Sequence, residues 1–253
     1  MGAVAPRPCR RVNEIDVAFV EPLYDQNVGF IARAMKNFCL GRLVLVNPRC
    51  PLGVEAIKYS MHGVDKLKNA VFMKSVENLV SSYDYVLCST GKIGSSIIRR
   101  SMTPEEAAKR IVSFTGRRVV VIGREDRGLS NEELKLCDAI VTIPANPEYP
   151  ILNASHAATI LFYIIYRTAH ENVKVIERPS REELEHFIEY LTLLAKELGM
   201  REEKIDGLKT AARRLLAETT APAQDLSLLF GVIRKSYEKI RALKDLERGA
   251  KPE

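Results

Sequence analysis

The sequence predicts an α/β protein with a mostly parallel sheet, followed by a small all-α extension. Over the first two thirds of the chain, apolar or β-branched runs typical of strands alternate with stretches of helical periodicity, which indicates βαβ units. In the last third the strand-like runs stop and only helical patterns remain. At 253 residues the chain is long enough to bury a substantial core.

Six strands are expected, each a short run of Val, Ile and other apolar residues. They cover residues 15–22, 42–48, 70–73, 83–90, 117–123 and 139–145. The fifth run is apolar without alternation, which fits a central strand buried on both faces. Helices are expected between the strands at 28–38, 53–60, 75–82, 104–113 and 130–136.

The expected domains are residues 1–172 and a helical extension over residues 180–253. Ser180 and Glu183 have the spacing of a capping box at the start of the extension. The last helix is predicted to carry one apolar face made of Leu226, Leu229, Phe230, Ile233, Tyr237, Ile240 and Leu243. A unit of this size is marginal alone, so we expect it to pack on a partner or on itself across a dimer.

Composition limits the function classes. The net charge is +6, and the excess lies within residues 1–180, which hold 24 basic and 18 acidic residues, so a polyanionic partner is favoured. Five cysteines without C-x-x-C spacing predict reduced thiols in a cytoplasmic protein, with neither zinc nor a disulfide framework. No apolar run approaches the ~18–20 residues of a membrane span, and the N-terminus lacks the apolar core of a secretory signal.

The first stretch that a core does not require is "EPLYDQNVGFIARAMKNF". A strand ends at Pro22, and Asn27 is predicted to cap the helix that follows. Arg33 lies within the apolar part of that helix. Its guanidinium could hold a phosphate or an attacking oxygen, or the side chain could simply extend to solvent.

The second stretch is "VVVIGREDRGLSNEEL", in which a buried strand runs into Gly123. Glycine after a strand permits the backbone to approach a ligand closely. A charged solvent loop is a credible interpretation of Arg124, Asp126 and Arg127 and less so of Glu125, and Arg127 could instead reach a ligand.

The third stretch, "IPANPEYPILNASHA", sets three prolines between a strand and an apolar helix that Asn153 is predicted to cap. Such a loop holds its backbone in a fixed shape at the carboxyl end of a strand, where open α/β folds bind ligands. Its carbonyls and amides could grip a flat, hydrogen-bonding group such as a nucleobase. A weaker fourth stretch, "CSTGKIG", also follows a strand.

Several common enzyme motifs are missing from the sequence. No G-x-G-x-x-G follows the first strand, and "STGKIGSS" lacks the spacing of a P-loop. Neither G-x-S-x-G nor H-E-x-x-H occurs. Dinucleotide-dependent oxidoreductases, P-loop NTPases, serine hydrolases of the α/β type and zinc proteases are therefore disfavoured.

Together the three stretches resemble the motifs of the SPOUT superfamily of RNA methyltransferases, specifically the TrmH/TrmJ-like ribose 2′-O-methyltransferases. The order and separation of the motifs agree over about residues 13–170, and the "NPEYP" loop points to the TrmJ-like branch. The resemblance implies a deep trefoil knot at the carboxyl end of the sheet, which binds S-adenosylmethionine.

The resemblance also assigns roles to individual residues. The target ribose would be handled by Asn27, Arg33, Glu125 and Asn153. The S-adenosylmethionine site would be lined by Ser89, Thr90, Gly91, Gly123, Ile143, Pro150, Ile151 and Leu152. Two positions depart from the family pattern: Ile151 replaces a frequent serine, and Cys39 replaces a glycine in a turn that must then tolerate a Cβ atom.

By the same resemblance the substrate is tRNA, modified at cytidine or uridine 32 of the anticodon loop, and the protein is a homodimer. Basic residues of the first domain could follow the RNA phosphates, among them Arg7, Arg10, Arg11, Lys92, Arg99 and Arg100. Two alternatives stay open: the same chemistry on ribosomal RNA, and a non-catalytic RNA-binding SPOUT protein, for which only Ile151 speaks.

Overall fold

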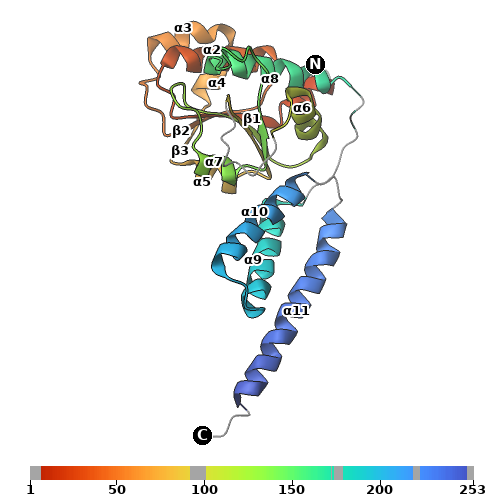
Figure 1. Ribbon diagram of the computed structural model, residues 1–253. Helices are drawn as coiled ribbons and strands as arrows, with labels where there is room; N and C mark the ends of the chain where they lie inside the picture. Colours follow the sequence, from red (N-terminus) through yellow and green to blue (C-terminus); the bar gives the residue numbers. More distant parts are fainter. Residues whose placement is uncertain (1–6, 92–100, 172, 174–178, 219–222, 250–253) are drawn as a thin grey trace. The chain divides into compact units, whose positions relative to one another are not determined.

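The computed structural model describes residues 7–91, 101–171, 173, 179–218 and 223–249 (Figure 1). The chain divides into two compact units, Met1–Ile176 and Glu177–Glu253. Lys92, Arg99 and Arg100, three of the basic residues suggested as RNA contacts, lie outside the described residues.

The first unit is built on a six-stranded, all-parallel sheet in the order β3-β2-β1-β5-β4-β6. All six predicted strands are confirmed, each somewhat shorter than predicted. Most of the residues trimmed from the predictions belong to loops at the carboxyl ends. The strands are β1 (Ile15–Val20), β2 (Leu43–Val46), β3 (Val71–Met73), β4 (Tyr85–Ser89), β5 (Arg118–Ile122) and β6 (Ala139–Val141).

The helices between the strands also follow the sequence pattern. The predicted helices are α2 (Asp25–Asn37), α3 (Val54–Ser60), α5 (Val76–Ser81), α6 (Pro104–Ser113), α7 (Asn131–Leu136) and α8 (Ala154–Thr168). Three short elements were not predicted: α1 (Arg7–Val12), the 3₁₀ turn η1 (Met61–Gly63) and α4 (Val64–Lys68). Each is too short to show a helical period in the sequence.

Alternate residues of the central strands enter two apolar layers, one on each face of the sheet. Val17 and Phe19 of β1 belong to the layer that includes buried residues of α2, α6 and α8. Ala18 and Val20 belong to the layer that α5 and α7 cover. Burial on both faces is the reason that β5 and its neighbours are apolar without alternation.

The strand order brings the candidate loops together. β1 pairs with β5, β5 with β4, and β4 with β6, all parallel, so their carboxyl ends meet at one edge of the sheet. The three motif loops follow β1, β5 and β6, and the weaker fourth stretch follows β4. The crevice at such an edge is where open α/β sheets bind ligands.

The prediction of five reduced thiols is wrong for four of them. Cys9 pairs with Cys39 and Cys88 with Cys137, at sequence separations of 30 and 49 residues. Only Cys50 is a free thiol, and it is buried. Spacing gave no sign of the pairs because tertiary packing alone brings each partner close. Cys39 has φ +60°, so the turn does accept a Cβ atom in a conformation that favours glycine.

The second unit consists of α9 (Arg181–Glu197), α10 (Glu202–Glu218) and α11 (Ala223–Gly249). The capping box of Ser180 and Glu183 is confirmed. The small core of this second unit is formed by Leu184, Phe187, Ile188, Ala212 and Leu226. On the predicted apolar face of α11, Leu226 is buried, whereas Leu229 and Leu243 are exposed. No helix in the described part of the chain is long and apolar enough to cross a membrane.

Candidate active site

A cavity of about 370 Å³ lies at the carboxyl ends of β4, β5 and β6. This volume falls within the range of small-molecule sites. All eight residues expected to contact a cofactor line it: Ser89, Thr90, Gly91, Gly123, Ile143, Pro150, Ile151 and Leu152. Three loops that are distant in the sequence therefore share one cavity, whereas the cofactor contacts themselves remain a prediction.

The floor of the cavity is fixed by bonds between strand ends. The Ser89 hydroxyl donates to the Val121 carbonyl at 3.0 Å, and the Thr90 amide donates to the Val141 carbonyl at 3.0 Å. These bonds join the end of β4 to β5 on one side and to β6 on the other. A ligand in the cavity would thus meet backbone that is already ordered.

Of the glycines Gly91 and Gly123 at the cavity, Gly123 is required by contacts within the chain. A Cβ atom on Gly123 would lie 2.8 Å from the Gly128 carbonyl carbon, because the loop after β5 folds back onto the strand end. The sequence suggested close approach to a ligand; the structure shows close approach to this loop. A Cβ atom on Gly91 would lie 3.0 Å from Cδ1 of Ile151, the far end of a side chain that can give way.

The Glu125 carboxylate is tied to the segment that begins α2. It accepts the backbone amides of Leu23 at 3.0 Å and Tyr24 at 3.3 Å, and the Asn27 side-chain amide at 3.2 Å. Tyr24 is the N-cap residue of α2 and makes no capping bond with its own side chain. A carboxylate at this end of a helix also interacts favourably with the helix dipole.

Asn27 extends this contact to the third motif. Its side-chain oxygen accepts the Asn153 amide at 3.2 Å, and the Asn153 oxygen in turn accepts the Ser155 backbone amide at 2.8 Å. The prediction that Asn153 caps α8 is confirmed. The prediction that Asn27 caps α2 is wrong: the helix begins at Asp25, so Asn27 lies inside the first turn and its buried side chain joins two loops instead.

Arg33 lies apart from this chain of contacts. Its side chain is exposed on α2, and it makes no hydrogen bond or ion pair with any other described residue. It does not line the cavity. The structure thus joins three of the four residues expected to handle ribose and leaves the guanidinium of the fourth free to meet a ligand.

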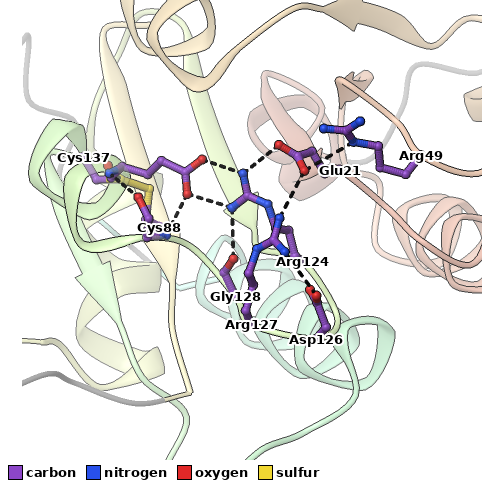
Figure 2. Close-up of polar contacts among 10 residues, drawn as sticks. Glu21, Arg49, Cys88, Arg124, Asp126, Arg127, Gly128 and Cys137 are labelled. Atoms are coloured by element: carbon purple, nitrogen blue, oxygen red, sulfur yellow. Dashed lines mark hydrogen bonds and ion pairs between the residues drawn. A yellow bond between two sulfur atoms is a disulfide. The ribbon is translucent and has the colours of Figure 1, made fainter.

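Arg124 was expected in solvent, and that prediction is wrong. Its guanidinium forms a bidentate ion pair with Glu133, at 2.8 Å for both bonds, and reaches Glu21 at 2.8 Å (Figure 2). Hydrogen bonds to Glu133 and then to Glu21 raise the pKa of Arg124 further above its ordinary value. The bond from Arg124 is also the main cause that lowers the pKa of Glu21 to about 2. Asp126 and Arg127 are exposed, as expected.

The proline-rich loop presents its side chains outward. The Tyr149 amide donates to the Asn146 carbonyl at 2.9 Å, and the Glu148 amide donates to the Asn146 side-chain oxygen at 3.1 Å, so a turn closes within the loop. Tyr149 is 79% exposed, beside the cavity residues Pro150 and Ile151. The rigid loop therefore offers one large aromatic surface at the edge of the cavity.

Comparison with known proteins shows which family this chain resembles. Residues 14–163 match the model of the SpoU rRNA Methylase family. The chain is 36% identical, over 76% of its length and 84% of the relative's, to the tRNA (cytidine-2′-O-)-methyltransferase TrmJ of Methanocaldococcus jannaschii. It is 30% identical to the tRNA (cytidine/uridine-2′-O-)-methyltransferase TrmJ of Pectobacterium atrosepticum, over 88% of this chain and 96% of that one.

Solved structures agree with these relatives. The crystal structure of TrmJ from Z. mobilis ZM4 superposes with a TM-score of 0.69 at 27% identity, covering 87% of this chain and 97% of that one. A probable methylase family protein from Haemophilus influenzae superposes with a TM-score of 0.61 at 25% identity, covering 92% and 99%. The chain therefore belongs to the SpoU methylase family, whose fold implies the deep trefoil knot expected at this edge of the sheet.

Proposed function

We propose that the protein transfers a methyl group from S-adenosylmethionine to a ribose 2′-hydroxyl of tRNA, at cytidine or uridine 32 of the anticodon loop. The observation that carries the proposal is the joining of Glu125, Asn27 and Asn153 beside a cavity lined by all eight expected cofactor residues. The names of the archaeal and bacterial relatives favour tRNA and a 2′-hydroxyl. Position 32 rests on the family resemblance.

The residues of the cavity fit such a cofactor. Ile143, Ile151 and Leu152 give an apolar wall for a flat adenine, while the ordered ends of β4 and β5 give backbone polar groups for its edge and ribose. Glu125 and Asp126 line the cavity together with Arg124 and Arg127, so the acidic and basic side chains there are equal in number. When bound, S-adenosylmethionine supplies an electrophilic methyl group.

The protein's own residues have to position the ribose oxygen and manage its proton. Arg33 lies in the C-terminal half of α2, is exposed and makes no ion pair with the other residues that the structure describes, and its planar fork suits a phosphate or a developing alkoxide. Because the guanidinium of arginine stays protonated in proteins, it is a poor base; its role is to stabilise charge on the oxygen while a phosphate or water accepts the proton. Asn27 and Asn153 hold the first and third motifs in register around that oxygen.

A second copy of the chain is proposed to cover one face of α2 and α8. Phe30 on α2 is 39% exposed and Tyr163 on α8 is 49% exposed, and both are large apolar surfaces for a single chain to leave in water. Arg33 lies three residues after Phe30, so it shares a face of α2 and would border such an interface. Light scattering should give the mass of two chains, and Tyr163→Glu should shift it toward one.

The helical unit is proposed to contribute to tRNA binding. Arg234, Lys235 and Lys239 are exposed on α11, where they can meet phosphates. Replacing all three with serine should weaken tRNA binding and flatten its dependence on salt, whereas S-adenosylmethionine affinity should not change. If the triple variant binds tRNA as tightly as wild type at every salt concentration, these three residues of the helical unit do not contribute to tRNA binding.

The direct test uses tritiated S-adenosylmethionine and unmodified tRNA transcripts, with mass spectrometry to map the label. Label on the ribose of nucleotide 32 is expected, and varying that nucleotide gives the accepted bases. The same assay is run on ribosomal RNA fragments. Label on these fragments and not on tRNA would favour the rRNA substrate that the name of the matched family suggests. Absence of both label and cofactor binding would indicate a binding protein without this chemistry.

A further inference from the structure

The loop after β5 turns two adjacent side chains to opposite sides. Glu125 reaches the amides that begin α2, whereas Arg124 reaches Glu21 and Glu133. The loop closes on itself, because the Gly128 amide donates to the Arg124 carbonyl at 3.0 Å. Residues from Gly123 to Leu129 line the candidate cofactor cavity, so whatever fixes this loop also fixes one wall of the site.

Arg124 is held from three elements at once. Glu133 belongs to α7, where its carboxylate also accepts the Ser130 amide at 2.7 Å in a capping box. Glu21 follows the end of β1. The third contact is with the Gly128 carbonyl, which accepts a bond from the guanidinium at 3.2 Å and closes the loop from within (Figure 2).

The arginine side chain is only 10% exposed, and its carboxylate partners are 14% and 16% exposed. Buried charges are costly unless they are paired, so this cluster resists rearrangement of any one member. Glu21 has φ +43°, a conformation that a glutamate rarely adopts, and its carboxylate is also contacted by Arg49 at 3.4 Å. The backbone at the end of β1 is thus bent in a way that directs Glu21 into the cluster.

We propose that Arg124 is a positioning residue, which sets the 124–128 loop so that Glu125 meets α2 and the loop backbone faces the cavity. This inference rests on the proposed function. Arg124 acts through its neighbours and need not touch the ribose. A lysine could replace its charge but not its fork, since one ammonium cannot make the bidentate bond to Glu133 and reach Glu21 and Gly128 as well.

Four proteins separate positioning from charge: wild type, Arg124→Gln, Arg124→Lys and the matched control Arg49→Gln. Arg49 contacts the same Glu21 but is 56% exposed and does not line the cavity. For Arg124→Gln we expect S-adenosylmethionine Kd to rise about 10-fold and kcat on tRNA to fall about 10- to 100-fold. The Kd and kcat of Arg124→Lys should lie between those of wild type and those of Arg124→Gln. Both values for Arg49→Gln should stay within about twofold of wild type.

The outcomes that overturn the proposal are distinct. A folded Arg124→Gln protein with wild-type Kd and kcat would do so, and so would an Arg124→Lys protein equal to wild type, because charge alone would then suffice. If Arg124→Gln does not fold, Glu133→Gln removes the bidentate partner's charge while keeping an oxygen for Ser130. We expect it to lower kcat about 3- to 10-fold, and an unchanged kcat would reduce Arg124 to a stabilising role.

A measurement without ligand keeps this test independent of the proposed function. Hydrogen–deuterium exchange over residues 123–129 should be faster in Arg124→Gln than in Arg49→Gln, because the Gly128 amide loses the cluster that closes its loop. Equal exchange would overturn the positioning role. Failure of the wild type to bind S-adenosylmethionine or methylate tRNA would instead contradict the proposed function and leave the loop result standing.

Discussion

Glu125 and Arg33 differ in how the fold uses their charge. The Glu125 carboxylate accepts three N–H groups from a segment about 100 residues earlier in the chain, so part of its role is to join two motifs. Arg33 is exposed and makes no polar contact with the other residues that the structure describes. A charge that the fold already satisfies is expected to matter for stability and geometry, and an unsatisfied one for the ligand.

The largest effect is expected at Arg33. Arg33→Ala should lower methyl transfer to tRNA about 100- to 1000-fold, because a cation that stabilises developing charge is removed. Its thermal midpoint should remain that of the wild type, since an exposed side chain without partners contributes little to folding. Lys36→Ala, one turn along the same helix and paired with Asp65, is the control and should stay within about twofold. Full activity of Arg33→Ala would end its catalytic assignment.

Glu125→Ala should affect both properties. Three donors lose their acceptor, so unfolding free energy should fall by about 2 kcal/mol, and methyl transfer should fall about 10- to 100-fold as the first motif shifts. Urea denaturation and single-turnover methylation measure the two effects on the same preparation. Glu125→Gln retains one oxygen acceptor, so its unfolding free energy and its rate of methyl transfer should both fall less than those of Glu125→Ala. An unchanged stability in Glu125→Ala would erase the contrast with Arg33.

The ion-paired Glu21 is another charge that the fold satisfies, and its contribution to stability is expected to depend on pH. Its pKa is lowered from 4.5 to about 2, chiefly by the bond from Arg124, so its contribution to stability is present above about pH 4.5 and is lost as pH falls toward 2. Glu21→Gln should therefore cost about 1–2 kcal/mol at pH 7, and the difference from wild type should shrink steadily below pH 4.5. Urea unfolding at pH 7, 4 and 3 measures it. A difference that is constant with pH would mean that packing, not charge, holds Glu21.

The smallest effect is expected at Ile151. The side chain is 42% exposed and contacts Gly91 without any polar role, so Ile151→Ser should change S-adenosylmethionine Kd by no more than about threefold. Calorimetry gives the value. A gain or loss beyond tenfold would show that a hydroxyl at this position bonds the ligand directly, and that the isoleucine marks a real departure in this chain.

The sequence by itself determined the six strands, most of the helices and the loops that carry the site. These features depend on local periodicity and on capping residues such as Asn153 and Ser180, which act within a few positions of where they stand. The cavity residues were assigned by the family resemblance, and the parallel strands bring them together because their carboxyl ends meet at one edge.

Tertiary structure alone decided which distant groups meet. Arg124 reads as a solvent charge in the sequence, and only the parallel pairing of β1 with β5 brings it to Glu21, 103 residues away. Asn27 reads as a helix cap, yet the helix begins earlier and the amide bonds Glu125 instead. The two disulfides close over 30 and 49 residues for the same reason. Local sequence sets the conformation of each segment, but contacts between segments follow from packing the whole sheet.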